Sequence, residues 1–247
     1  MASVRNFLAL NDPDPKEMSV VNHLDELRQR LIVCIITVVL GSTVGWFLVK
    51  PVFALLSHPL TQYGVHLVAG TLTEGFVSEL KVAVAIGITI GLPVLLYEVW
   101  MFVAPAVSVN TRRYVVPFVL LGVVLFMMGI GVGYAVFPLV VKFLIAQGQN
   151  LGLTLLPRVG DYISQFALVL VVFGAVFEMP VVLTFLSLIG VVTSRFLRSK
   201  RKIAVMLGLI AAMIITPGAD PITPFVTAII IYILYEFSII MVRLVHR

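Results

Sequence analysis

Long uncharged apolar runs alternate with short polar or charged segments along this chain. A membrane-spanning helix needs about 20 apolar residues, and several of the runs reach that length. Pro217 and Pro221 lie on either side of Asp220 and divide the last run in two, because proline interrupts a helix. We therefore expect six spans, of which the fifth and sixth are short: about 31–50, 76–97, 114–138, 162–186, 203–216 and 222–241.

The segments between the runs complete this prediction. Residues 1–19 form a polar N-terminal tail, and residues 20–247 form a single membrane domain. Residues 51–75 mix histidine, proline and glycine, which indicates an extramembrane loop with short helical pieces. The third run contains small residues that let a neighbouring helix approach closely, namely Gly122, Gly129, Gly131 and Gly133.

The composition excludes an ordinary soluble domain. Hydrophobic residues make up 60% of the 247 positions and charged residues only 12%, whereas a soluble domain has roughly 45–50% and 25%. The mean hydropathy is +1.11. The single cysteine, Cys34, excludes a disulfide framework and a cysteine-based metal site. The sequence predicts an all-α polytopic membrane protein.

The positive charges predict its orientation. Most of the 17 lysines and arginines fall in the N-terminal segment, the second-to-third and fourth-to-fifth turns, and the C-terminal tail. The opposite side carries Lys50, Lys81, Lys142 and Arg158. Because short cytoplasmic loops carry the positive excess, we expect both termini in the cytoplasm. Orientation also explains the net charge of +5, so we expect no nucleic-acid partner.

The start of the first span combines an apolar stripe with charged residues. The stripe has helical spacing and consists of Val20, Leu24, Leu27 and Leu31. Glu26 and Arg30 are four residues apart and can pair on one helix face. One interpretation is an amphipathic helix lying at the membrane interface. The other is that Asp25 and Glu26 present carboxylates to a cationic partner such as two arginines, which pair bidentately with carboxylates. The sequence leaves both open.

Three further acidic residues have different contexts. Glu178 lies within the fourth span, where an ionisable residue is costly and usually faces the bundle interior or a wet cavity. The alternative is a protonated side chain bonded across helices for packing alone. Pro180 should kink the helix beside it. Asp220 is equally well explained as the cap of the last helix, and Glu98 lies among aromatic residues that an interfacial belt would explain.

No catalytic apparatus is visible in the sequence. It contains no HExxH, GxSxG or Walker-type glycine loop, and its histidines lack ligand spacing: His23, His58, His66 and His246. We expect no enzyme activity, cofactor or metal. A competing function is a proton- or ion-coupled secondary transporter that uses Glu178. Inverted repeats would favour that function, but the two halves are asymmetric.

Several motifs, in order along the chain, resemble the TatC family, the multispanning subunit of the twin-arginine protein translocase. Residues 23–31 (HLDELRQRL) are similar to the family's HLxELRxRL, and residues 93–102 (PVLLYEVWMF) to its P-x-x-x-Y-[EQ]-x-W-x-F. Further matches follow at residues 104–106 (APA), 112–113 (RR), 136–139 (VFPL), 177–180 (FEMP) and 216–220 (TPGAD). The resemblance covers residues 20 to 243.

The resemblance implies a fold and a function. It implies six spans in a cup-like arrangement with both termini cytoplasmic, in the inner membrane of a prokaryote. It also implies a receptor that binds twin-arginine signal peptides, recruits the single-span partners TatA and TatB, self-associates, and supports export of folded proteins by the proton-motive force.

Site residues carried over by position fall into three groups. The signal-peptide group is Glu26, Arg28, Leu31 and Phe102. The transport group is Pro59, Glu178 and Asp220, and the partner-contact group is Met213 and Thr216.

This chain departs from the family pattern at Thr111. The family usually has a glutamate there, which is taken to bind the twin arginines. Threonine keeps a hydroxyl but no charge, and losing a charge-assisted hydrogen bond costs roughly 1.5 to 3 kcal/mol. Either Glu26, Asp25 or Glu98 compensates, or the protein recognises its signal differently. A second departure is Pro224, where many members have glutamine, within the region that contacts partners.

Overall fold

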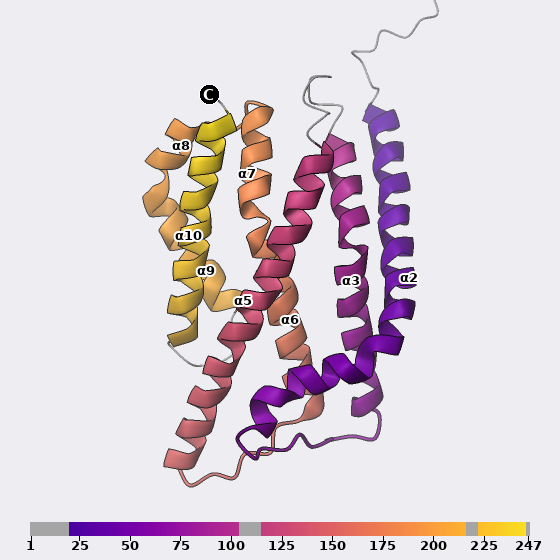
Figure 1. The fold of residues 1–247 in the computed structure, drawn as a ribbon, viewed down its shortest axis with the longest axis vertical. Coiled ribbons are helices and arrows are strands. Elements are labelled where there is room, and N and C mark those ends of the chain that lie inside the picture. Colours follow the sequence, from indigo (N-terminus) through magenta and orange to yellow (C-terminus); the bar gives the residue numbers. More distant parts are fainter. Residues whose placement is uncertain (1–19, 104–114, 216–221, 246–247) are drawn as a thin grey trace, which may run out of the picture.

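The computed structural model describes residues 20–103, 115–215 and 222–245, which form a bundle of α-helices (Figure 1). The helices are α2 (Val20–Thr61), α3 (Glu74–Val103), α5 (Val115–Asn150), α6 (Val159–Phe177), α7 (Met179–Leu188), α8 (Ser194–Ser199), α9 (Arg201–Ile215) and α10 (Ile222–Val245). Among the described residues, 5 helical stretches are long and apolar enough to cross a membrane: residues 23–61, 74–102, 115–150, 159–188 and 224–245. The all-α polytopic class is therefore confirmed. Helix α9 has 15 residues and is shorter than these stretches.

The first helix is longer than expected. Helix α2 runs unbroken for 42 residues and contains both Pro51 and Pro59. The prediction that residues 51–75 form a loop with short helical pieces is therefore wrong for its first part, and residues 20–31 are not a separate interfacial helix. Figure 1 shows that α2 bends sharply and that its last part lies across one end of the bundle. We attribute the bend to Pro51, because proline removes a helical hydrogen bond.

Glycines hold α2 and α3 close together. A Cβ added to Gly41 would lie 2.6 Å from the backbone oxygen of Gly87, and one added to Gly45 would lie 2.6 Å from the oxygen of Ala83. Small residues permit this backbone approach. The pairing fixes the register between the two helices along their length, including the end where α2 begins.

The centre of the bundle is built from α5, α6 and α7. Phe137 of α5 stacks on Phe166 of α6 with ring centroids 3.9 Å apart, and Phe166 and Phe173 are fully buried. The glycines of α5 behave differently from one another. A Cβ at Gly129 would collide with the backbone of α6, 2.6 Å from the oxygen of Phe173, whereas one at Gly131 would meet nothing within 4 Å.

The expected interruption of the fourth span is present. Helix α6 ends at Phe177 and α7 begins at Met179, so the break falls at Glu178. Pro180 occupies the first turn of α7, where its missing N–H is tolerated.

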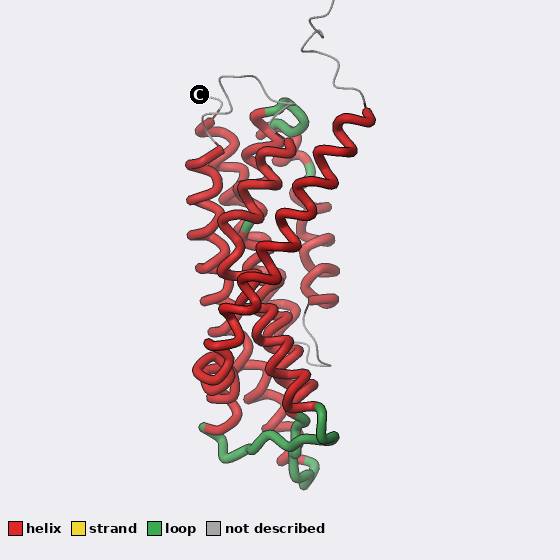
Figure 2. Tube along the Cα trace, turned by 90° about the vertical axis from the view of Figure 1, so that its right-hand side faces the viewer, coloured by secondary structure: helices red, strands yellow, loops and turns green. Residues whose placement is uncertain are grey.

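The connections at one end are tied to each other. The Val68 N–H donates to the Pro157 oxygen (3.0 Å), and the Val159 N–H donates to the Val68 oxygen (2.9 Å). The Glu74 carboxylate accepts bonds from the N–H groups of Gly70 (2.5 Å) and Gly160 (2.8 Å). Figures 1 and 2 show these connections side by side beneath the helices.

We call this end, with residues 62–73 and 151–158, the outer end. The opposite end, where α2 begins and α10 finishes, is called the inner end (Figure 1). The described chain therefore starts and finishes at the same end of the bundle.

Candidate functional site

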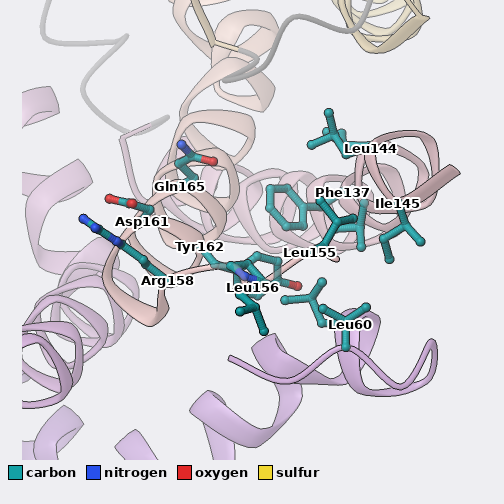
Figure 3. Close-up of a pocket in the computed structure, with 14 residues that line it drawn as sticks. Leu60, Phe137, Leu144, Ile145, Leu155, Leu156, Arg158, Asp161, Tyr162 and Gln165 are labelled. Carbon is teal, nitrogen blue, oxygen red and sulfur yellow. The ribbon is translucent and has the colours of Figure 1, made fainter. Parts of the chain in front are cut away.

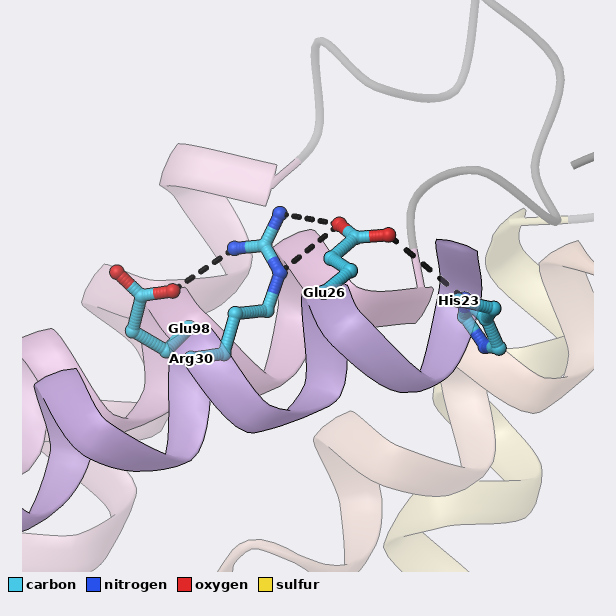
Figure 4. Close-up of polar contacts among 4 residues, drawn as sticks. All are labelled: His23, Glu26, Arg30 and Glu98. Atoms are coloured by element: carbon cyan, nitrogen blue, oxygen red, sulfur yellow. Dashed lines mark hydrogen bonds and ion pairs between the residues drawn. The ribbon is translucent and has the colours of Figure 1, made fainter. Parts of the chain in front are cut away.

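Two acidic residues and one arginine meet at the inner end, where α2 lies against α3 (Figure 4). Arg30 donates from Nε (3.0 Å) and Nη2 (2.6 Å) to Oε1 of Glu26. It also donates from Nη1 to Oε2 of Glu98 at 2.8 Å. We call Glu26, Arg30 and Glu98 the inner carboxylate cluster. The expected pairing of Glu26 with Arg30 is confirmed, and Glu98 joins it from a distant part of the sequence.

The cluster is shielded but still open to water. The side chains of Glu26 and Arg30 are each 20% exposed and that of Glu98 is 15% exposed. Two carboxylates share one guanidinium, so the cluster carries one uncompensated negative charge when all three groups are ionised. The second oxygen of Glu26 accepts no hydrogen bond from the described residues. Nδ1 of His23 lies 3.7 Å from this oxygen.

Aromatic residues flank the cluster. His23 stacks on Phe102 with ring centroids 4.4 Å apart and planes 12° from parallel. Trp100, in contrast, is only 4% exposed and packs against Phe118 and Phe185. An interfacial belt is therefore the wrong explanation for Trp100, because the tryptophan anchors α3 to α5 and α7. The stacking of His23 on Phe102 and the bond from Arg30 to Glu98 bring the two motif segments, residues 23–31 and 93–102, together.

The remaining signal-peptide candidates are less enclosed. Asp25, Arg28 and Leu31 are exposed on α2. Their neighbours Leu24 and Leu27 are also exposed, at 59% and 43%, so Leu24, Leu27 and Leu31 of the apolar stripe remain uncovered by the described residues. Thr111 lies outside the described residues, as do Asp220 and Thr216. The two explanations of Asp220, as the cap of the last helix and as a residue of the transport step, therefore both stay predictions.

Glu178 lies deep in the bundle at the break between α6 and α7. Its side chain is 8% exposed, and neither carboxylate oxygen has a hydrogen-bond partner among the described residues. A Cβ added to Gly122 of α5 would lie 2.8 Å from Oε2 of Glu178 and 2.8 Å from Leu96 of α3. The expected inward orientation is confirmed. Gly122 provides the space that the carboxylate occupies.

Two other candidates lie far from the cluster. Pro59 is buried at the outer end, in the last part of α2. Met213 is 55% exposed on α9, on a surface that no described residue covers. We call this surface the α9 face; its exposed apolar residues are Ile203, Met206, Leu207, Ile210, Met213 and Ile214.

A cavity of about 320 Å³ lies at the outer end. Figure 3 shows apolar side chains such as Phe137, Ile145 and Leu155 on one side, and Arg158 and Asp161 on the other. None of the candidate site residues predicted from the sequence lines this cavity. No pattern in the sequence predicted the cavity, because its walls come from three separate segments. The described residues contain no group of three or more histidine, cysteine or acidic side chains placed to hold a metal.

Comparisons with known proteins agree on one family. The model of the family described as Sec-independent protein translocase protein (TatC) matches residues 22–229. The TatC of Carboxydothermus hydrogenoformans is 32% identical over 233 residues, covering 94% of this chain and 96% of that protein. The TatC of Aquifex aeolicus is 37% identical over 234 residues, covering 93% and 97%. A crystal structure of a twin-arginine translocase receptor, TatC, superposes with a TM-score of 0.79 at 38% identity, covering 91% of this chain and 100% of that chain.

Proposed function

This chain belongs to the TatC family of Sec-independent protein translocase proteins, and we propose that it is the receptor and scaffold of a twin-arginine translocase. It is a non-enzymatic, multi-pass subunit of the inner membrane. In the proposed function it binds twin-arginine signal peptides at its inner end and supports export of folded proteins by the proton-motive force. The family membership leaves no reason to retain the ion-coupled transporter that Glu178 alone would permit.

The observation that carries the receptor role is the inner carboxylate cluster. Glu26 and Glu98 come from different helices, yet both bond to the same guanidinium at 2.6 to 3.0 Å. Their spacing therefore fits a guanidinium. Guanidinium is a planar fork that bonds carboxylates through several nitrogens, whereas the ammonium of lysine is a point charge. This supports recognition of arginine in preference to lysine.

Glu98 supplies the carboxylate that Thr111 lacks. It belongs to α3 and shares Arg30 with Glu26 at 2.8 Å, so a second acidic group is available without a glutamate at position 111. Phe102 and Leu31 offer apolar surface nearby, and Arg28 and Asp25 extend the charged surface along α2.

The proposed topology has six spans with both termini in the cytoplasm. Helix α9, at 15 residues, is the short fifth span, and α10 is the sixth. Two facts support the orientation: α2 begins and α10 finishes at the same end (Figure 1), and most of the basic residues belong to segments at that end. The inner end is then the cytoplasmic one.

The other candidates take part in transport. The α9 face, with Met213, is a surface for the single transmembrane helix of a TatA- or TatB-type subunit, because its apolar side chains are uncovered. By its place in the motif resemblance, Thr216 joins Met213 in this partner-contact role; it lies outside the described residues. Glu178, Pro59 and Asp220 serve the transport step, and several copies of the chain associate in the working complex.

The receptor role is tested by peptide binding to the full-length protein purified in detergent. A labelled twin-arginine signal peptide should bind more tightly than the same peptide with two lysines. Glu26→Gln and Glu98→Gln should each weaken binding about tenfold, the effect of losing one charge-assisted pair. The matched control is Glu236→Gln, which removes a carboxylate that pairs with Arg201 at 2.7 Å elsewhere. Equal binding of both peptides by a folded sample would contradict the receptor role.

A further inference from the structure

We infer that Arg30 competes with the arginines of a signal peptide for Glu26 and Glu98, so that the free receptor keeps its own site occupied. This inference rests on the proposed function and adds a regulatory residue to the same site. In the receptor without peptide, Arg30 fills the position of a ligand guanidinium. Binding of a twin-arginine peptide then requires Arg30 to release at least one carboxylate.

The geometry shows how completely Arg30 engages the site. All three guanidinium nitrogens are used, two toward Glu26 (3.0 and 2.6 Å) and one toward Glu98 (2.8 Å). Charge-assisted bonds of this kind are among the strongest in proteins. An incoming guanidinium finds only the second oxygen of each carboxylate free of Arg30. In Glu26 that second oxygen is shielded from water and faces His23 at 3.7 Å.

The charge balance indicates that Arg30 has to leave. With Arg30 in place, Glu26 and Glu98 carry one net negative charge, and two peptide arginines would bring two positive charges. Three guanidinium groups would then share two carboxylates. With Arg30 released, each peptide arginine has one carboxylate, which is the arrangement that compensates two partly desolvated cations.

Arg30 has an alternative position available to it. Its side chain is already 20% exposed, and a long flexible arginine side chain reaches water by rotation while its methylene groups stay on the protein surface. Arg30 therefore favours a paired arginine ligand: two peptide arginines provide one guanidinium for each carboxylate, whereas a single peptide arginine offers no more than Arg30 already provides.

The test compares Arg30→Gln with the wild-type, full-length protein in detergent, using twin-arginine and twin-lysine signal peptides. Arg30→Gln should bind the twin-arginine peptide roughly tenfold more tightly, the change expected when one competing charge-assisted pair is removed. Arg30→Lys should lie between the two proteins, because an ammonium engages fewer acceptors than the fork of arginine. The matched control is Arg201→Gln, since Arg201 pairs with Glu236 at 2.7 Å and is absent from the cluster.

Binding kinetics provide an independent readout. If release of Arg30 precedes binding, the observed association rate of the wild-type protein should level off at high peptide concentration. In Arg30→Gln it should rise linearly. Thermal unfolding of each variant in detergent confirms that it is folded, and Arg30→Lys keeps the test available if Arg30→Gln does not fold.

The outcomes separate this inference from the proposed function. Tighter binding by Arg30→Gln or Arg30→Lys, with Arg201→Gln unchanged, supports competition. Weaker or unchanged binding by the folded variants, while wild type still prefers arginine, overturns competition and leaves the receptor role intact; Arg30 would then only position the carboxylates. Equal binding of both peptides by the wild-type protein overturns the receptor role itself.

Discussion

The inner carboxylate cluster and Glu178 place the same functional group in opposite surroundings. Glu26 and Glu98 share a guanidinium where water still reaches them, whereas Glu178 is 8% exposed and has no hydrogen-bond partner among the described residues. A paired carboxylate near water exchanges partners readily. An unpaired carboxyl group inside a bundle is costly unless it gains a partner or stays protonated. The difference teaches that the first site is suited to ligand recognition and the second to a later step.

The largest effect should come from removing the buried carboxyl group. Glu178→Ala should lower transport of a folded precursor, because an ionisable residue kept inside a membrane bundle is costly and usually functional. We expect a loss of about a hundredfold, which corresponds to about 2.7 kcal/mol in the barrier. Signal-peptide affinity should stay within about twofold of wild type, since the cluster is untouched. Transport into inverted membrane vesicles and peptide binding in detergent measure the two effects.

A matched control for Glu178 is available on α10. Thr227 is 2% exposed, and its hydroxyl also has no hydrogen-bond partner among the described residues. Thr227→Val should keep transport near the wild-type rate. If Glu178→Ala lowered transport and peptide affinity equally, the two sites would not have separate roles.

Filling the space beside Glu178 should have the next largest effect. A Cβ at Gly122 would lie 2.8 Å from the carboxylate, so Gly122→Ala should displace Glu178 and destabilise the protein by about 1 to 3 kcal/mol, as overpacking does. Transport should fall about tenfold, in line with that strain. Thermal unfolding and vesicle transport measure these effects.

The control for Gly122 lies about two and a half turns further along the same helix. A Cβ at Gly131 meets nothing within 4 Å, so Gly131→Ala should unfold at or above the wild-type temperature, because alanine favours helix. If the two alanine variants behaved alike, contact with Glu178 would not be the cause of the Gly122 effect.

Separating α2 from α3 should disturb the inner cluster, because the pairing of these two helices holds Glu26 beside Glu98. A Cβ at Gly41 would lie 2.6 Å from the backbone oxygen of Gly87, and the backbone has to shift to relieve the contact. Gly41→Ala should therefore move Glu26 away from Glu98. We expect peptide binding to weaken about fivefold, which is less than the loss expected when one charge-assisted pair is removed entirely. Gly75→Ala is the control, because a Cβ there meets nothing within 4 Å. Peptide affinity that did not change in Gly41→Ala would show that the helix spacing does not set the site.

The fold class could be predicted because hydrophobic runs report lipid exposure directly. The limits of α9 and α10 fall within a few residues of the expected fifth and sixth spans, since Pro217 and Pro221 divide that region. The continuation of α2 through Pro51 could not be predicted. A proline is tolerated there because the helix bends and its last part packs on the outer end, with Leu56 and Leu60 buried, and this burial depends on tertiary structure.

The candidate site could be predicted only in part, for a similar reason. Local spacing identified the Glu26 and Arg30 pair, because residues four apart meet on a helix. The motif resemblance pointed to Glu98 and Phe102 as nearby candidates. It did not show that Glu98 bonds Arg30, which requires the glycine contacts between α2 and α3. Likewise, the sequence marked Gly122 as a small residue but not as the neighbour of Glu178.

The smallest effect concerns the salt dependence of peptide binding, and it tests whether the inner carboxylate cluster acts through partly exposed charges. The range of electrostatic attraction falls from about 10 Å at 0.1 M salt to about 3 Å at 1 M. The wild-type affinity should therefore decrease severalfold over that range, because the cluster is partly exposed and its ion pairs are screened. Glu26→Gln removes one of the two negative charges, so its affinity, already lower, should change less with salt. Glu236→Gln removes a carboxylate outside the cluster and should keep the wild-type slope. A plot of log affinity against log salt concentration measures all three. If the slope of Glu26→Gln equalled that of the wild type, Glu26 would not contact the peptide, and recognition would have to come from Glu98 or from exposed groups such as Asp25.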